Sequence, residues 1–82
     1  MVKVHFGASA CRDLAGGLTH ADVDAVSVRG MIQALDDSFP GMAEEIARRT
    51  AIAIDGEIHQ DALFEALAPG AEVYLIPRIG GG

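Results

Sequence analysis

Residues 71–82, AEVYLIPRIGGG, are the most informative part of this chain, because they combine an apolar strand with a glycine-rich end. Val73 and Leu75 should point to one face of the strand, because side chains alternate along it. Tyr74 and Ile76, which are also apolar, should point to the opposite face. A strand that is apolar on both faces usually lies in the middle of its sheet. We therefore expect residues 71–76 to form a central strand.

The residues after this strand predict a mobile tail. Pro77 should end the strand, because proline has no N–H to donate to a neighbouring strand. Five residues follow it, and when extended they reach at most ~17 Å. Glycine has no side chain to pack, so we predict a folded domain over residues 1–77 and a flexible glycine tail over residues 78–82. Such a tail is thin enough to enter a narrow channel in a partner and to present its terminal carboxylate there.

Immediately upstream of the last strand, two turn signals frame a hairpin and a connecting segment. Asp55-Gly56 favours a tight hairpin turn, since both residues accept positive φ at little cost. We expect strands from Thr50 to Asp55 and from Glu57 to His59 on either side of it. Pro69-Gly70 predicts a second turn just before the last strand. Residues 61–68 fit either one helical turn or a loop that packs on the core.

The N-terminal part predicts another pair of strands. Residues 2–6 alternate between apolar and polar side chains, as a half-buried strand does. The Gly16-Gly17 pair suggests a turn, and residues 18–26 form a weaker strand pattern. We expect these two strands to pair directly as a hairpin.

A helix should follow this first hairpin. Ser27 is a suitable helix cap, and apolar residues recur after it at helical spacing. Pro40 disfavours helical geometry at Phe39, so the helix should end near Ser38. Residues 43–49 predict a short second helix. The order hairpin, helix, hairpin, strand indicates an α+β fold of the β-grasp (ubiquitin-like) type, a mixed sheet of four to five strands packed on one main helix.

Composition and charge narrow the classes of partner. The 82 residues fit one domain, and 12 acidic against 6 basic residues give a net charge of -6. The basic residues are scattered along the sequence with one adjacent pair, so neither nucleic acid nor an anionic membrane is an expected partner. The negative charge instead suits a protein with a basic face. The single Cys11 excludes an internal disulfide, and with no apolar stretch long enough to span a membrane we expect a cytoplasmic protein.

Several stretches together resemble the MoaD/ThiS sulfur-carrier family. They comprise residues 1–6, 27–41, 54–57, 67–73 and 76–77 and the terminal diglycine. The resemblance implies a β-grasp fold and adenylation of Gly82 by an enzyme of the ubiquitin-activating type, followed by conversion to a thiocarboxylate. It is closest to the small subunit of molybdopterin synthase, which donates sulfur to molybdopterin inside the large subunit. The chain departs from the family pattern at Gly7, Arg78 and Gly80.

The site residues follow from this resemblance and from the expected facing of the last strand. Gly82 is the reactive residue, through its terminal carboxylate. The residues expected to bind partners lie in the tail and on the sheet face away from the helix, namely Ile58, Tyr74, Ile76, Arg78, Ile79, Gly80 and Gly81. Alternatively, Tyr74 and Ile76 pack on the loop around residues 63–67. We expect no bound cofactor and no metal, with ATP used by the activating enzyme; the three histidines and Cys11 share no ligand spacing.

Other functions use the same fold. The chain fits a carrier for thiamine or another sulfur pathway, a ubiquitin-like modifier that joins its C-terminus to lysines, or a β-grasp binding module with an inert tail. The terminal glycines also fit a frayed end or a remnant of a linker. We expect no independent enzyme, because the sequence contains no group of catalytic residues, and Cys11 lacks a nearby base and is expected to be a packing residue.

Overall fold

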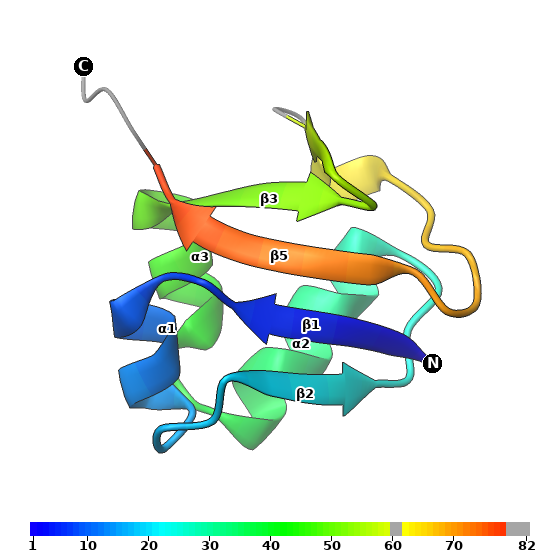
Figure 1. Ribbon diagram of the computed structural model, residues 1–82. Helices are drawn as coiled ribbons and strands as arrows, with labels where there is room; N and C mark the ends of the chain where they lie inside the picture. The colour runs from blue at the N-terminus through cyan, green and yellow to red at the C-terminus, as the bar shows by residue number, and fades with distance from the viewer. Residues whose placement is uncertain (60–61, 79–82) are drawn as a thin grey trace.

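One mixed sheet organises the molecule. The computed structural model describes residues 1–59 and 62–78 of the chain. Helices α2 and α3 cover one face of the sheet, and α1 lies at the end where β1 finishes (Figure 1). The elements, in chain order, are β1 (Val2–Phe6), α1 (Ser9–Leu14), β2 (His20–Val23), α2 (Val28–Ser38), α3 (Met42–Arg49), β3 (Thr50–Ile54), β4 (Glu57–His59), the 3₁₀ turn η1 (Ala62–Phe64) and β5 (Glu72–Pro77).

The last strand lies at the centre of the sheet. The strand order is β2-β1-β5-β3-β4, with β5 parallel to β1 and antiparallel to β3. Val73 and Leu75 are fully buried on the helix side, as the two-sided apolar pattern of residues 71–76 predicted. A parallel pair requires a long connection, and here all the elements between β1 and β5 in the chain provide it. This arrangement confirms the predicted β-grasp architecture.

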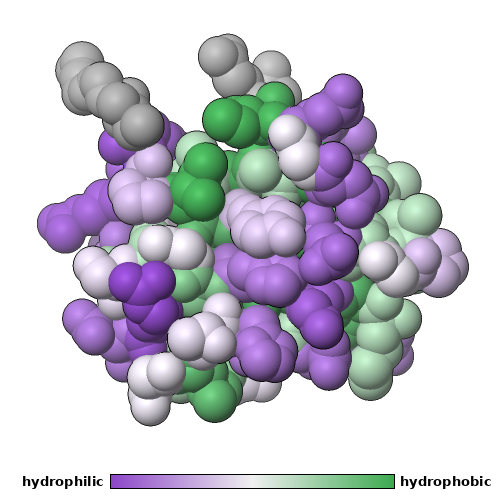
Figure 2. Space-filling view, viewed as in Figure 1, coloured by the Kyte–Doolittle hydropathy of each residue, from purple (hydrophilic) through white to green (hydrophobic). Residues whose placement is uncertain are grey.

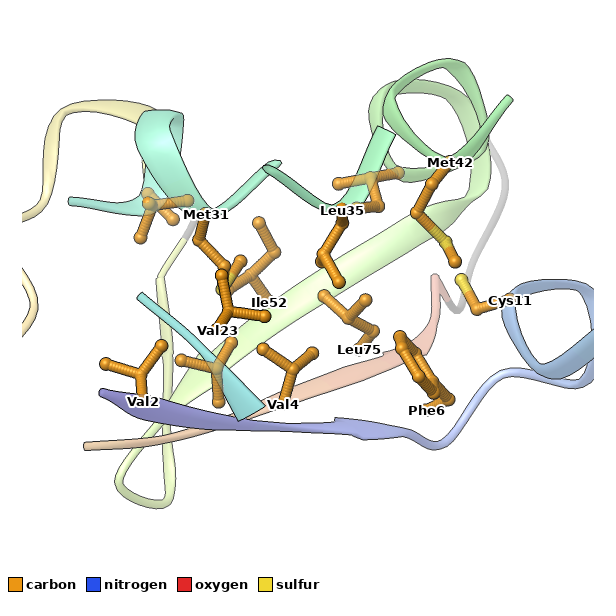
Figure 3. Packing of buried hydrophobic residues seen from close by; sticks show 14 of the residues in the cluster. Val2, Val4, Phe6, Cys11, Val23, Met31, Leu35, Met42, Ile52 and Leu75 are labelled. Atoms are coloured by element: carbon orange, nitrogen blue, oxygen red, sulfur yellow. The ribbon is translucent and has the colours of Figure 1, made fainter. Parts of the chain in front are cut away.

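The core lies between the sheet and the helices. Val2, Val4 and Phe6 of β1 all point inward and are at most 2% exposed. Figure 3 shows them facing Leu35 of α2, among other apolar side chains from the helices and strands. The ring of Phe6 also packs perpendicular to that of Phe39 at the end of α2, with ring centroids 6.1 Å apart. These contacts tie the central strands to α2.

Helix α2 has the predicted start and end. The Ser27 side chain accepts a hydrogen bond from the Gly30 N–H at 3.1 Å, which satisfies one of the unpaired donors of the first turn. The helix ends at Ser38, two residues before Pro40. Helix α3 (Met42–Arg49) also forms, one residue earlier than predicted. Its acidic first turn and basic last turn suit the helix dipole.

The connection between β1 and β2 differs from the prediction. The two strands pair antiparallel, as expected, but α1 lies between them, so they do not form a direct hairpin. Ala8, Cys11 and Ala15 are the buried residues of this segment, spaced three and four apart. Their small side chains gave only a weak helical pattern. Strand β2 is also shorter than the predicted 18–26.

The turns adopt the expected geometry. Asp55 and Gly56 both have positive φ, 48° and 90°, and join β3 to the edge strand β4. Gly70 likewise has φ 83°, just before β5. Of the two readings of residues 61–68, the structure shows a short 3₁₀ turn at Ala62–Phe64.

Candidate functional site

The tail is predicted to do the chemistry, and it leaves the domain from the central strand. The last described residue is Arg78, directly after β5. Ile79, Gly80, Gly81 and Gly82 lie outside the described residues, so their proposed roles stay predictions. What the structure does define is the point from which the tail starts and the surface around it.

Arg78 is held against the C-terminal end of α3. Its backbone N–H donates to the Arg49 carbonyl oxygen at 2.9 Å. Its guanidinium Nη2 donates to the carbonyl oxygens of Thr50 at 3.2 Å and, less closely, of Ala47 at 3.5 Å. Carbonyl groups at a helix end have no partner within the helix and carry partial negative charge, so an arginine stabilises them. Arg78 is therefore anchored beside the end of α3.

Gly7 allows β1 and β5 to approach closely beside this point. A Cβ atom on Gly7 would lie 3.0 Å from the Leu75 carbonyl oxygen and 3.2 Å from Ile76 Cγ2. Arg12 Nη1 donates to the Phe6 and Gly7 carbonyl oxygens at 2.9 and 3.3 Å and so holds this end of β1. A side chain at position 7 would therefore crowd the Leu75 carbonyl oxygen and the end of the Ile76 side chain, which would have to shift.

The outward face of the sheet brings residues from all five strands into one row. The register aligns them in the order His20, His5, Tyr74, Ala53 and Ile58. Tyr74 is 36% exposed and Ile58 63% exposed, while the small Ala53 between them is buried. Tyr74 and Ile58, predicted to bind partners, thus share one face, separated by a single alanine.

Tyr74 packs on a histidine rather than on the loop near residue 63. The rings of His5 and Tyr74 stack with centroids 4.3 Å apart and planes inclined by 9°. His5 Nε2 also lies 2.9 Å from Glu72 Oε1. His5 and Ala53 were not predicted as site residues, and only the pairing of β5 with β1 and β3 reveals them. A tyrosine held in this way presents a rigid, partly apolar surface.

An apolar groove connects this face with Pro77 and Arg78, where the tail begins and which we call the root of the tail. Strand β4 pairs only with Ile52–Ile54, so the beginning of β3 has no β4 partner among the described residues. The groove, of ≈ 750 Å³, lies there and is lined by Ile58, Leu63, Ile76 and Arg78 among others. Figure 2, which views the outward face, shows hydrophobic side chains gathered over β3 and the end of β5. Ile58, Ile76 and Arg78, all predicted to bind partners, therefore border one continuous surface.

This fold and tail root can be compared with known proteins. The model of the ThiS family matches residues 9–82 of the chain. The chain belongs to the ThiS family. Members of this family are small ubiquitin-like sulfur carriers. No curated protein sequence gives a significant match to this ThiS-family chain.

Solved structures support the same fold for this ThiS-family chain. CysO of Mycobacterium tuberculosis superposes with a TM-score of 0.85 at 20% identity, covering 96% of this chain and 100% of that one. CysO in the Amycolatopsis orientalis BexX/CysO complex has the same TM-score at 17% identity, with both chains fully covered. SAMP1 of Haloferax volcanii has a TM-score of 0.71 at 27% identity, covering 99% of this chain and 98% of that one. The first two identities are low, so those likenesses establish the fold alone.

The described part of the ThiS-family chain holds no second candidate centre. Among residues 1–59 and 62–78, no three His, Cys, Asp or Glu side chains come together as a metal site would require. No helix in these ranges is long and apolar enough to cross a membrane. The histidine that neighbours His5 is His20, with ring centroids 6.3 Å apart, whereas His59 lies on the far edge strand. The surface around the tail root therefore remains the candidate site.

Cys11 is a core residue in this ThiS-family chain. Its side chain is fully buried and points toward Met42 in Figure 3. Its Sγ lies 3.7 Å from Thr50 Oγ1. Burial raises the pKa of the Cys11 thiol, and the negative charge of Glu45 adds to the rise, against the opposing effect of the Thr50 hydrogen bond. The thiol is therefore neutral near pH 7. A neutral thiol is a poor nucleophile, because the reactive form is the thiolate.

We expect Cys11 to resist alkylation in the folded protein. Iodoacetamide at neutral pH should leave the intact mass unchanged, whereas the same treatment in denaturant should add one label. A Cys11→Ala variant should take up no label in either condition. The thiol ionises at a lower pH in the unfolded chain than in the folded chain. The contribution of Cys11 to the free energy of unfolding should therefore fall as the pH rises past the ordinary thiol pKa. Rapid labelling of the folded chain would show that the site opens.

Proposed function

We propose that this chain is a sulfur carrier for molybdopterin synthesis, whose Gly82 carboxylate is adenylated and then converted to a thiocarboxylate. The observation that carries the proposal is the family match, which extends through the terminal glycines to residue 82. The fold supports it, since the central strand β5 leads directly into the tail. The stretch from Leu67 to Val73 resembles the molybdopterin branch of the family and favours that pathway.

The proposed chemistry takes place entirely at the C-terminal carbonyl. The Gly82 carboxylate attacks the α-phosphorus of ATP, so that an acyl adenylate forms and pyrophosphate leaves. A persulfide sulfur on a donor protein then attacks the carbonyl carbon, AMP leaves, and an acyl disulfide forms. A second thiol of the donor reduces this disulfide, which releases the thiocarboxylate and leaves the donor oxidised. Adenylation is needed because AMP is a far better leaving group than the oxide of a carboxylate.

The carrier contributes position to these steps. From Arg78, the four residues to Gly82 reach about 14 Å when extended. The carboxylate can therefore enter a partner's active site while Tyr74, Ile58 and the apolar groove contact the partner's outer surface. Binding the folded domain outside makes the reaction of the terminal group effectively intramolecular. The adenylating enzyme and, later, the large subunit of molybdopterin synthase supply the catalytic groups.

Intact-mass spectrometry tests this proposal. The full chain is incubated with ATP, an adenylating enzyme of the ubiquitin-activating type and a persulfide donor. We expect one oxygen to be replaced by sulfur, and fragmentation should locate the change at Gly82. Addition of the large subunit of molybdopterin synthase with its precursor should return the carrier to its original mass. An unchanged mass in the first step would contradict the carrier function, and failure of the second step alone would reject the molybdopterin acceptor.

A second candidate function is that of a protein modifier. SAMP1 of Haloferax volcanii, which is similar over nearly the whole chain, belongs to proteins described as small archaeal modifier proteins. The same activated Gly82 would then form an isopeptide bond with a lysine amine. Peptides that carry a Gly-Gly remnant on lysine, recovered from cells that produce the chain, would support this role. The absence of such peptides, together with a thiocarboxylate, favours the carrier.

A further inference from the structure

Positive charge gathers at the root of the tail, although the sequence alone suggested scattered basic residues. Arg48 and Arg49 end α3, and Arg78 follows β5. Arg78 donates hydrogen bonds to the backbone carbonyl oxygens of Arg49 and Ala47, so the end of α3 and the end of β5 carry these three residues at the same end of the molecule. We call them the arginine cluster. It holds three of the six basic residues of a chain whose net charge is -6.

The arginine cluster is open to a partner. All three residues are exposed. Arg48 forms an exposed pair with Glu44 of the same helix at 3.3 Å, a type of contact that contributes little energy. Arg78 uses one guanidinium nitrogen for its two carbonyl contacts, so its remaining donors stay available. Hydrophilic side chains accordingly gather along the edge of Figure 2 where β5 ends.

We propose that the arginine cluster docks on an acidic surface around the entrance of the adenylating enzyme's active site. This inference rests on the proposed function. The cluster lies at the point where the tail must enter the partner, and it adjoins the apolar groove through Arg78. The partner surface that fits is therefore apolar opposite Ile58 and Ile76, and carboxylate-rich opposite the arginines.

In the proposed docking the cluster acts outside the chemistry. A tail that is extended in the channel would carry Gly82 about 14 Å from Arg78, so the arginines would remain at the entrance and away from the adenylate phosphate. Their charge acts on the encounter instead. Apart from Glu44 and Glu45, which share α3 with two of the arginines, the acidic residues that the structure describes lie on other elements, where only three basic residues accompany them. An acidic rim would attract the tail end and repel the other surfaces, which orients the carrier before contact.

A polyanion is a poorer partner for this surface. Three arginines make a small footprint, and the surrounding acidic residues would repel a nucleic acid backbone. A protein rim with a few carboxylates matches the size of the cluster. A heparin column tests this alternative. If it retained the unaltered chain at moderate salt but not a variant with Arg49 replaced, a polyanion would be favoured and the proposal overturned.

Steady-state adenylation tests the inference with matched variants. Arg49→Glu changes the cluster, and Arg29→Glu makes the same charge change on an exposed helical residue at the start of α2. For Arg49→Glu we expect KM for the carrier to rise about tenfold at low salt, with kcat unchanged. The rise should shrink as salt is added, because exposed charges are screened. Arg29→Glu should raise KM far less, because the changed charge lies away from the cluster and is screened.

The outcomes separate this inference from the proposed function. If the unaltered chain is not adenylated, the carrier function fails, and the inference fails with it. If the unaltered chain is adenylated but Arg49→Glu and Arg29→Glu share its KM, only the arginine inference is overturned. Thermal unfolding of both variants checks that the change in KM does not come from loss of the fold. A lower kcat for Arg49→Glu at saturating carrier would also contradict a role confined to docking.

Discussion

A chain that ends at Gly80 should keep its fold and lose adenylation by more than about 100-fold. The described contacts of the sheet and core are made by residues up to Arg78, so removal of Gly81 and Gly82 should leave the domain intact. The terminal carboxylate, however, would stop about 7 Å short of the reacting phosphorus. A displacement of even 1 Å can cost about 100-fold in rate, so the shortened chain should be inactive. Pyrophosphate release in the presence of ATP and the adenylating enzyme measures this.

The matched control keeps the length of the tail. Val26→Asp changes an exposed residue outside the tail and the groove and leaves the carboxylate at its normal distance, so its activity should stay close to that of the unaltered chain. The shortened chain should also compete with the full chain for the enzyme, because it retains the docking face. Adenylation of the shortened chain at the normal rate would mean that the last two glycines are dispensable, and the proposed chemistry would be wrong.

Ile58→Asp should weaken binding to the adenylating enzyme by about 30-fold, the loss expected when a central apolar contact of an interface is removed. Ile58 is 63% exposed on the edge strand and borders the groove next to Ile76. A carboxylate there would be buried without a partner in the complex, whereas in the free chain it stays in water. Unfolding should therefore change by less than about 1 kcal/mol. Titration calorimetry measures the affinity, and urea denaturation measures the stability.

Val26→Asp provides the comparison for this substitution. Val26 is also β-branched and 79% exposed, but it precedes α2, away from the groove. Its replacement should leave the affinity unchanged. Equal affinities for Ile58→Asp and the unaltered chain would remove this face from the interface. Unlike the effect of Arg49→Glu, the loss at Ile58 should persist at high salt, because desolvation of a buried carboxylate is screened far less than exposed charge.

The strong local signals predicted most of the elements correctly. Ser27 marks the start of α2 and Pro40 its end. Both could be predicted, because a side-chain cap and the backbone restriction before a proline affect only the neighbouring residues. Asp55-Gly56 makes its hairpin turn for the same reason. Helix α1 was missed because its buried positions are alanines and a cysteine, whose small side chains hardly distinguish a helix from a loop. The predicted direct hairpin between β1 and β2 was wrong for that reason.

The central strand and the glycine end follow from the residues alone, because two-sided hydrophobicity and the absence of side chains are properties of consecutive residues. The surroundings of Pro77 and Arg78 depend instead on how the whole chain folds. His5 meets Tyr74, and Arg78 meets the end of α3, through pairings between segments that are distant in the chain. The register of the sheet and the packing of α3 set those neighbours. No local pattern encodes them, because each depends on the folding of both segments at once.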